Sequence, residues 1–171
     1  MPGRKRMARR HAARARGASP GRAGLKKVDL GHLPNLIGYA IRRAQIAVFQ
    51  DFQRSFAKFN IRPIQYGVLT VIESNPGLTQ TQVCAALGIK RANFVPLLNE
   101  LARRKLAERR GAVDQRANAL YLTKKGKLLM RKLRELNKMH ERRLAAGLSG
   151  KERAQLIRLL NRTRNAAQSH P

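Results

Sequence analysis

Three residues at the start of a predicted helix have side chains suited to binding DNA. Lys90 and Arg91 are adjacent, and Asn93 follows within the same turn. Lysine and arginine bind phosphate or the acceptor edge of guanine, whereas the asparagine amide fits the edge of adenine. Basic side chains oppose the dipole at the start of a helix, and an arriving phosphate backbone would remove that conflict. We therefore predict that these residues contact DNA; the alternative is a solvated surface.

A second basic group lies beside a polar loop. Residues 106–110 and 119–122 flank the loop 111–118 and predict a short two-stranded hairpin. Arg109 and Arg110 fall on its first strand. We predict that both arginines, on the strand that adjoins this loop, contact DNA.

Residue types that carry out catalysis are scarce. The chain has nine carboxylates and shows no paired acid, nucleophile elbow or phosphate-binding loop. The histidines are too scattered for a metal-binding spacing; they are His11, His32, His140 and His170. Cys84, the single cysteine, falls near the apolar face of a predicted helix, which favours a buried structural thiol over a redox sensor. We predict no enzymatic activity, no cofactor and no metal.

Charge indicates the class of partner. The 171 residues include 37 Lys and Arg against 9 Asp and Glu, for a net charge of +28, and 43% are hydrophobic. Such a chain can bury a core, and its charge favours nucleic acid first and an anionic membrane surface second. No apolar run reaches the roughly 18 residues of a membrane span, and one cysteine indicates a reducing compartment. Residues 1–27 hold ten basic and no acidic residues, which predicts a flexible arm.

Apolar periodicity and capping residues predict the helices. Thr79 and Ser149 each begin a capping box, and Thr123 caps a further helix. Two helices joined by a short turn that contains Gly88 form a helix-turn-helix pattern. The predicted helices span 33–59, 63–74, 80–87, 90–104, a stretch from 124 that ends before Gly147, and a last one from 150.

This order of elements is that of a winged helix-turn-helix with helical extensions at both ends. From about residue 33 to 165 the chain resembles the MarR family of bacterial transcription regulators. The resemblance rests on 78–83 with 87–89, on 114–116 followed by 120–123 and Gly126, and on Leu148, Ser149 and Glu152.

The resemblance implies a mainly α fold with a small β-hairpin wing and terminal dimerisation helices. It divides the chain into a basic arm (1–30), a first dimerisation helix (31–60), a DNA-binding lobe (61–122) and C-terminal dimerisation helices (123–171). It implies a homodimer on a pseudo-palindromic operator, with half-sites roughly 34 to 36 Å apart. It also implies a cytoplasmic, nucleoid-associated repressor that a small aromatic acid, a phenolic compound or its CoA thioester releases from DNA.

The resemblance also assigns individual roles. Arg116 matches the wing arginine that enters the minor groove, and Asp114 matches the carboxylate that holds it. The stripe Phe49, Phe52, Phe56 and Phe59 is expected to lie mainly in the dimer core. The effector cleft would be lined by Tyr39, Arg43, Phe52, Phe56 and Tyr66.

Two other functions stay open. A nucleoid-like architectural protein would bind DNA with a steep salt dependence and little sequence preference. An RNA-binding module is less favoured, because the predicted DNA face carries only Phe94 and Tyr121 for base stacking. Pro96 departs from the family pattern, and a proline inside a helix predicts a kink in the recognition helix.

Overall fold

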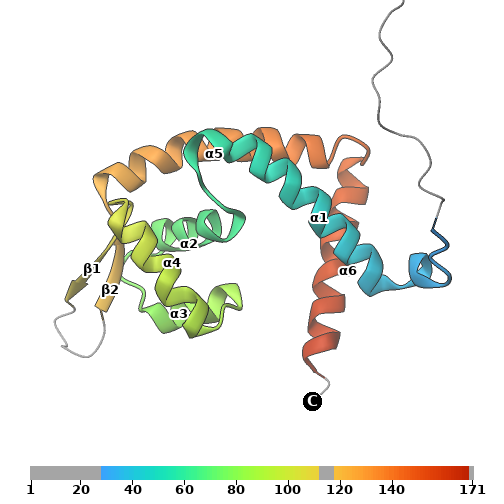
Figure 1. Ribbon diagram of the computed structural model, residues 1–171, viewed down its shortest axis with the longest axis horizontal. Helices are drawn as coiled ribbons and strands as arrows, with labels where there is room; N and C mark the ends of the chain where they lie inside the picture. The colour runs from blue at the N-terminus through green and yellow to red at the C-terminus, as the bar shows by residue number, and fades with distance from the viewer. Residues whose placement is uncertain (1–27, 112–117, 170–171) are drawn as a thin grey trace, which may run out of the picture.

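The computed structural model describes residues 28–111 and 118–169. Asp114, Arg116 and the basic arm up to residue 27 therefore lie outside the described residues. The helices are α1 (Ile37–Phe56), α2 (Pro63–Ser74), α3 (Gln80–Leu87), α4 (Arg91–Arg103), α5 (Lys124–Leu144) and α6 (Gly150–Gln168), with short 3₁₀ helices at Leu33–Asn35 and Ala57–Phe59. The strands β1 (Ala107–Gly111) and β2 (Asn118–Leu122) form the hairpin (Figure 1).

The prediction of one helix over 33–59 was wrong at both ends. Leu36 adopts an extended backbone, φ −91° and ψ 130°, which separates the first 3₁₀ helix from α1. After Phe56 the chain tightens into the second 3₁₀ helix, and Asn60 ends it in the left-handed region at φ 49°. The apolar spacing persists through these breaks, so periodicity alone did not reveal them.

The helix-turn-helix consists of α3 and α4. The hydroxyl of Thr79 accepts the Gln82 backbone N–H, while Gln82 reaches back to the Thr79 N–H, as the capping box predicted. Gly88 ends α3 at φ 62°, a conformation that costs glycine little. The helix α4 then continues on both sides of Pro96, so this residue removes one backbone donor without ending the recognition helix.

The hairpin is joined to the helix-turn-helix through its second strand. The strands pair antiparallel with Ala107 opposite Leu122, within one residue of the predicted boundaries. On its other edge, the Leu120 N–H donates to Leu78 O and Leu120 O accepts from Gly77 N, both at 2.9 Å. These two bonds fix the base of the wing to the turn that precedes α3.

The core of the lobe is built from side chains of α1, α2, α3, α4, β2 and α5. Phe52 and Phe56 are 5% and 0% exposed within the single chain, so the expectation that they lie mainly in a dimer core was wrong. Phe49, one turn earlier, is 42% exposed. The fully buried side chains include Phe56, Val68, Leu69, Ile72, Phe94, Leu98, Leu101, Leu120, Met130 and Leu133.

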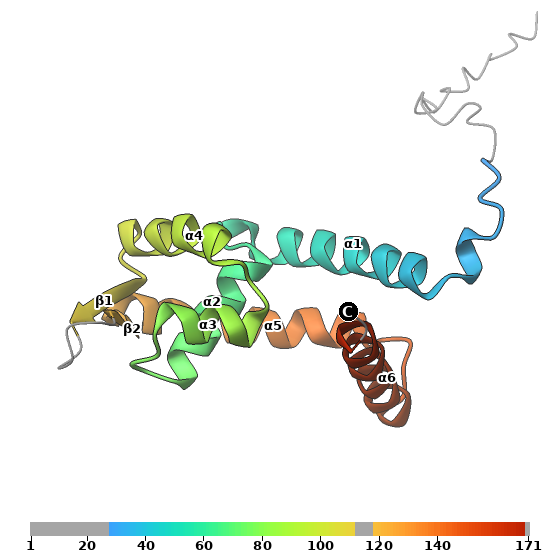
Figure 2. The same ribbon diagram turned by 90° about the horizontal axis from the view of Figure 1, so that it is seen from below.

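The C-terminal helices extend away from this core. The helix α5 lies along α1, and α6 projects from its end at a steep angle (Figures 1 and 2). No residue of α6 is buried by the described part of the chain, although it carries Leu156, Ile157, Leu159 and Leu160. Within residues 28–111 and 118–169, no helix combines the length and apolarity needed to cross a membrane.

Candidate DNA-binding surface and effector groove

The first turn of α4 presents an uncapped, basic helix end. Lys90 is the N-cap in an extended conformation, and its side chain caps no backbone N–H. The side chains of Lys90, Arg91 and Asn93 are all exposed, and the first turn contains no acidic residue. Because the first backbone N–H groups of a helix lack internal partners, this end combines free donors with two cations. The arrangement suits a phosphate group or the edge of a base.

Two arginines fix the orientation of α4. The guanidinium of Arg104 donates to the backbone carbonyls of Asn60 at 2.7 Å and Phe59 at 2.8 Å. Arg62, the N-cap of α2, pairs with Glu100 on α4. The role of Arg104 in positioning α4 depends on partners 44 and 45 residues away along the chain, so no local sequence pattern indicated it.

The wing arginines are held by neighbouring side chains. Arg109 donates to the Asn99 amide oxygen at 2.7 Å, which joins β1 to α4. Arg110 pairs with Glu108 at 2.6 Å and lies 4.6 Å from the ring centroid of Tyr121. Both arginines remain exposed, so they stay available to a phosphate backbone beside α4.

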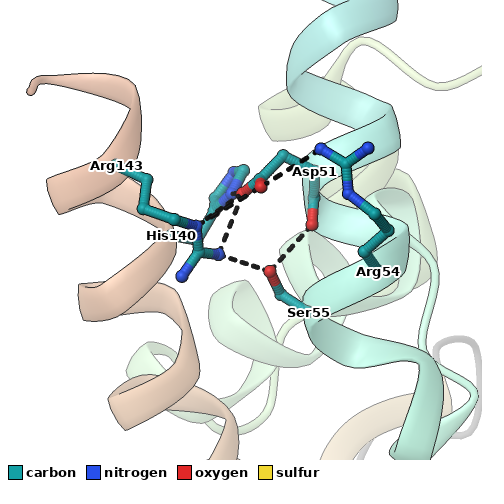
Figure 3. A network of polar contacts seen from close by, with 5 residues as sticks. All are labelled: Asp51, Arg54, Ser55, His140 and Arg143. Atoms are coloured by element: carbon teal, nitrogen blue, oxygen red, sulfur yellow. Dashed lines mark hydrogen bonds and ion pairs between the residues drawn. The ribbon is translucent and has the colours of Figure 1, made fainter. Parts of the chain in front are cut away.

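A polar network joins α1 to α5 (Figure 3). The carboxylate of Asp51 lies 2.7 Å from His140 Nδ1 and accepts from Arg143 at 2.9 Å. Arg143 also donates to the Ser55 hydroxyl, and Arg54 lies 3.5 Å from Asp51 on its other side. The Arg143 guanidinium, followed by His140, holds the pKa of Asp51 well below its ordinary value. His140 is 3% exposed, so its ring is packed inside the protein.

Aromatic rings gather beside this network. Phe52 and Phe56 stack with centroids 3.8 Å apart, and Tyr66 of α2 lies 5.6 Å from Phe56. His140 meets the Phe52 ring edge-on at 5.5 Å. Burial raises the pKa of the Tyr66 hydroxyl. The structure thus brings together three of the five residues predicted to line an effector cleft, but packs them as core.

The other two predicted residues lie elsewhere on α1. Tyr39 and Arg43 precede Phe52 by 13 and 9 residues in the same helix. At 1.5 Å rise per residue, they lie about 20 Å and about 14 Å from it along the axis. The predicted set therefore does not form one pocket within a single chain.

Two open grooves lie on the α4 side of the lobe. A larger groove of about 800 Å³ and a smaller one of about 450 Å³ share Arg62, Ile64 and Leu87. The larger is lined by Arg62, Ile64, Leu87, Gly88, Ile89, Lys90, Asn93, Pro96, Leu97 and Glu100. The smaller is lined by Phe49, Gln53, Arg62, Pro63, Ile64, Gly67 and Leu87. Apart from the aromatic stripe that includes Phe49, no pattern in the sequence indicated that the residues of the smaller groove lie together.

Comparison with known proteins agrees with this architecture. Residues 59–117 match the model of the MarR family. The putative transcriptional regulatory protein for the hcr operon of Thauera aromatica is 31% identical over 145 residues, covering 84% of this chain and 87% of that protein.

Solved structures extend the comparison to bound states. The transcriptional repressor CouR, bound to a 23-mer DNA duplex, is 36% identical with a TM-score of 0.77, covering 81% of this chain and 99% of that chain. CouR bound to p-coumaroyl-CoA is 36% identical with a TM-score of 0.74, covering 79% and 96%. PcaV from Streptomyces coelicolor, in complex with its natural ligand, is 26% identical with a TM-score of 0.72, covering 84% and 99%.

The matched length and identity settle the family. Regulators of this kind are winged-helix DNA-binding proteins and not enzymes. The chain belongs to the MarR family and is a transcriptional regulator.

Proposed function

We propose that this regulator is a homodimeric repressor that binds one operator sequence through α4 and the wing and leaves it when a small molecule binds. The observation that carries the proposal is the uncapped first turn of α4 with Lys90, Arg91 and Asn93 exposed together. The DNA-bound structure of CouR supports a DNA partner for the same fold. Arg109, Arg110, Asp114 and Arg116 are assigned to the wing contacts.

An apolar groove between α1, α5 and α6 supports a dimer. Its volume is about 460 Å³, and its lining includes Ile41, Leu144, Leu156 and Leu160. The four leucine and isoleucine residues of α6 are each about 45% exposed. Apolar faces of this extent are rarely left in water, and a second copy of the chain would cover them.

The effector that suits the grooves is an aromatic acid, a phenolic compound or the corresponding CoA thioester. The smaller groove offers Phe49 and Ile64 to an aromatic ring. The larger offers Lys90 to anionic groups, while its Arg62 is paired with Glu100, and it reaches Asn93 in the DNA-contact set. The ligand of CouR, p-coumaroyl-CoA, combines these two chemistries. To lower the occupancy of the operator tenfold, a ligand must bind the DNA-released conformation about 1.4 kcal/mol more favourably than the DNA-bound one.

Binding to duplexes that tile the gene's own upstream region tests the proposal. Fluorescence anisotropy at one near-physiological salt concentration is expected to find a duplex preferred about a thousandfold over scrambled DNA. The double variant Lys90→Ala/Arg91→Ala is expected to weaken that binding by about 1 to 3 kcal/mol for each side chain that binds DNA. The control Lys151→Ala/Arg158→Ala removes two exposed cations from α6 and should leave it unchanged.

The same assay distinguishes the proposed repressor from the architectural alternative. Equal affinity for every duplex, upstream or elsewhere in the genome, would contradict the repressor proposal and would indicate a protein that binds DNA without sequence preference. Titration of the preferred complex with p-coumarate, CoA and p-coumaroyl-CoA then separates the effector classes. Release by none of the three would contradict the effector assignment while leaving the operator intact.

A further inference from the structure

The outward face of α5 carries a stripe of exposed cations. Lys124, Lys127, Arg131 and Arg142 recur at intervals of 3, 4 and 11 residues, which places them on one side of the helix. All four are exposed. The opposite side of α5 holds the buried residues Met130, Leu133 and His140. The basic stripe therefore faces away from the core.

These cations lack the partners that other cations of α5 have. Arg134 pairs with Glu73 of α2 at 2.6 Å, and Arg143 pairs with Asp51 of α1 at 2.9 Å. No residue of the basic stripe forms an ion pair with another described residue. Lys127 and Arg131 are one helical turn apart, so their like charges repel. Glu135 also lies on this face and pairs with Lys138, so among the described residues the stripe keeps a net positive charge that an external anion would relieve.

The basic stripe lies on a different side of the lobe from the predicted DNA surface. The helix α2 packs against α5 on one side and α3 on the other. In Figure 1, α5 runs along the top, whereas α3 and the start of α4 lie at the bottom. A duplex held by the first turn of α4 therefore leaves the outward face of α5 open.

We propose that the basic stripe binds the phosphate backbone of a second DNA duplex, so that one regulator joins two DNA segments. This rests on the proposed function in one respect, that α4 holds the first duplex. The stripe extends about 27 Å along the helix axis, the length of about 8 base pairs. DNA suits it better than a lipid surface, because an interfacial helix needs a broad free apolar face, whereas Met130 and Leu133 of α5 are buried and only Leu128 and Met139 are exposed near the cations.

A two-duplex capture assay tests this. The preferred upstream duplex is fixed to beads and saturated with the full chain, and retention of a fluorescent unrelated duplex is measured. The wild-type protein is expected to retain the second duplex. Lys127→Gln/Arg131→Gln/Arg142→Gln is expected to lower that retention at least tenfold while changing binding to the fixed duplex less than twofold. For this variant, the slope of the logarithm of the second duplex's binding constant against the logarithm of the salt concentration should fall by about 2.7 units, because three cations no longer bind phosphates.

The matched control is Lys151→Gln/Arg158→Gln/Arg162→Gln, which removes three charges from the side of α6 opposite its apolar groove. An equal decrease in both variants would mean that total charge, and not the stripe, holds the second duplex, and would overturn the proposal. Absence of capture by the wild type, or capture of anionic vesicles in place of DNA, would do the same. Retention of the protein by the fixed duplex reports the proposed function separately.

Discussion

Asp51 shows how much one carboxylate does in a chain with only nine. It joins α1 to His140 and Arg143 of α5, beside the stacked Phe52 and Phe56. Its partners lie 89 and 92 residues away in the sequence. The composition therefore showed only that acidic residues are rare in this chain. The role of Asp51 follows from the packing of α1 against α5, which brings its partners to it.

We expect Asp51→Asn to lower the free energy of unfolding at pH 7. Because the pKa of Asp51 is lowered in the folded chain, its contribution is complete above its ordinary value of about 4 and is lost as the pH falls through the folded value. The difference between wild type and variant in urea unfolding should therefore shrink below about pH 4.

The control for this prediction is Glu135→Gln. Lys138 also lowers the pKa of Glu135, but that side chain is 69% exposed, so its removal should matter little. A stability difference at Asp51 that stays constant from pH 7 to pH 3 would contradict the assignment.

Local residue types predicted the exposure of the candidate DNA-contact residues better than the arrangement of the candidate effector residues. Lys90, Arg91 and Asn93 lie within one turn at the start of α4, so the position of this single helix is enough to explain why all three are exposed. The residues of a cleft come from several helices, and sequence spacing does not say which faces meet. Phe52 and Phe56 were therefore assigned to a cleft and a dimer core, whereas the structure buries them in the protomer.

Among the elements, α5 starts with an unusually close approach. A Cβ on Gly126 would lie 2.0 Å from the Leu106 carbonyl oxygen. That same carbonyl accepts the Thr123 N–H, and the Thr123 hydroxyl caps α5 at the Gly126 N–H. The absence of a side chain at this position is what lets α5 begin directly against the segment that joins α4 to β1.

Gly126→Ala should therefore destabilise the protein, by about 1 to 3 kcal/mol, although alanine favours helices. Gly38→Ala is the matched control, because it lies in the first turn of α1 with nothing within 4 Å of its Cβ. That change should be neutral or stabilise by up to about 1 kcal/mol. Chemical denaturation of both variants measures the contrast, and equal effects would refute the packing argument.

The ends of a helix were predicted correctly where a local capping sequence marks them. The capping boxes at Thr79 and Ser149 were predicted and are confirmed, because each is complete within four residues. The ends of α1 were predicted wrongly, because apolar spacing continues through its 3₁₀ neighbours. Pro96 does not end α4, since one missing backbone bond does not outweigh the buried Phe94, Leu97 and Leu98; the kink expected at Pro96 stays a prediction.

At the scale of the molecule, the dimer is the main prediction. Leu156→Glu/Leu160→Glu should convert the protein to monomers, because two charges would enter the apolar groove of α6. Lys151→Glu/Arg158→Glu makes a larger charge change on the other side of α6 and should leave the dimer intact. Sedimentation at micromolar concentration distinguishes them. A wild-type chain that sediments as a monomer would remove the basis for a two-fold operator.

The uninterrupted length of α5 has a mechanical consequence. Its 21 residues form one rod of about 32 Å that begins at the wing and ends at the apolar groove. With α5 acting as a lever, a tilt of about 5° at the dimer end would move the wing end by about 3 Å. Two such levers in opposite directions would change the separation of the recognition helices by more than one base-pair step. A small repacking near Leu144 would then be enough to take both half-sites out of register together.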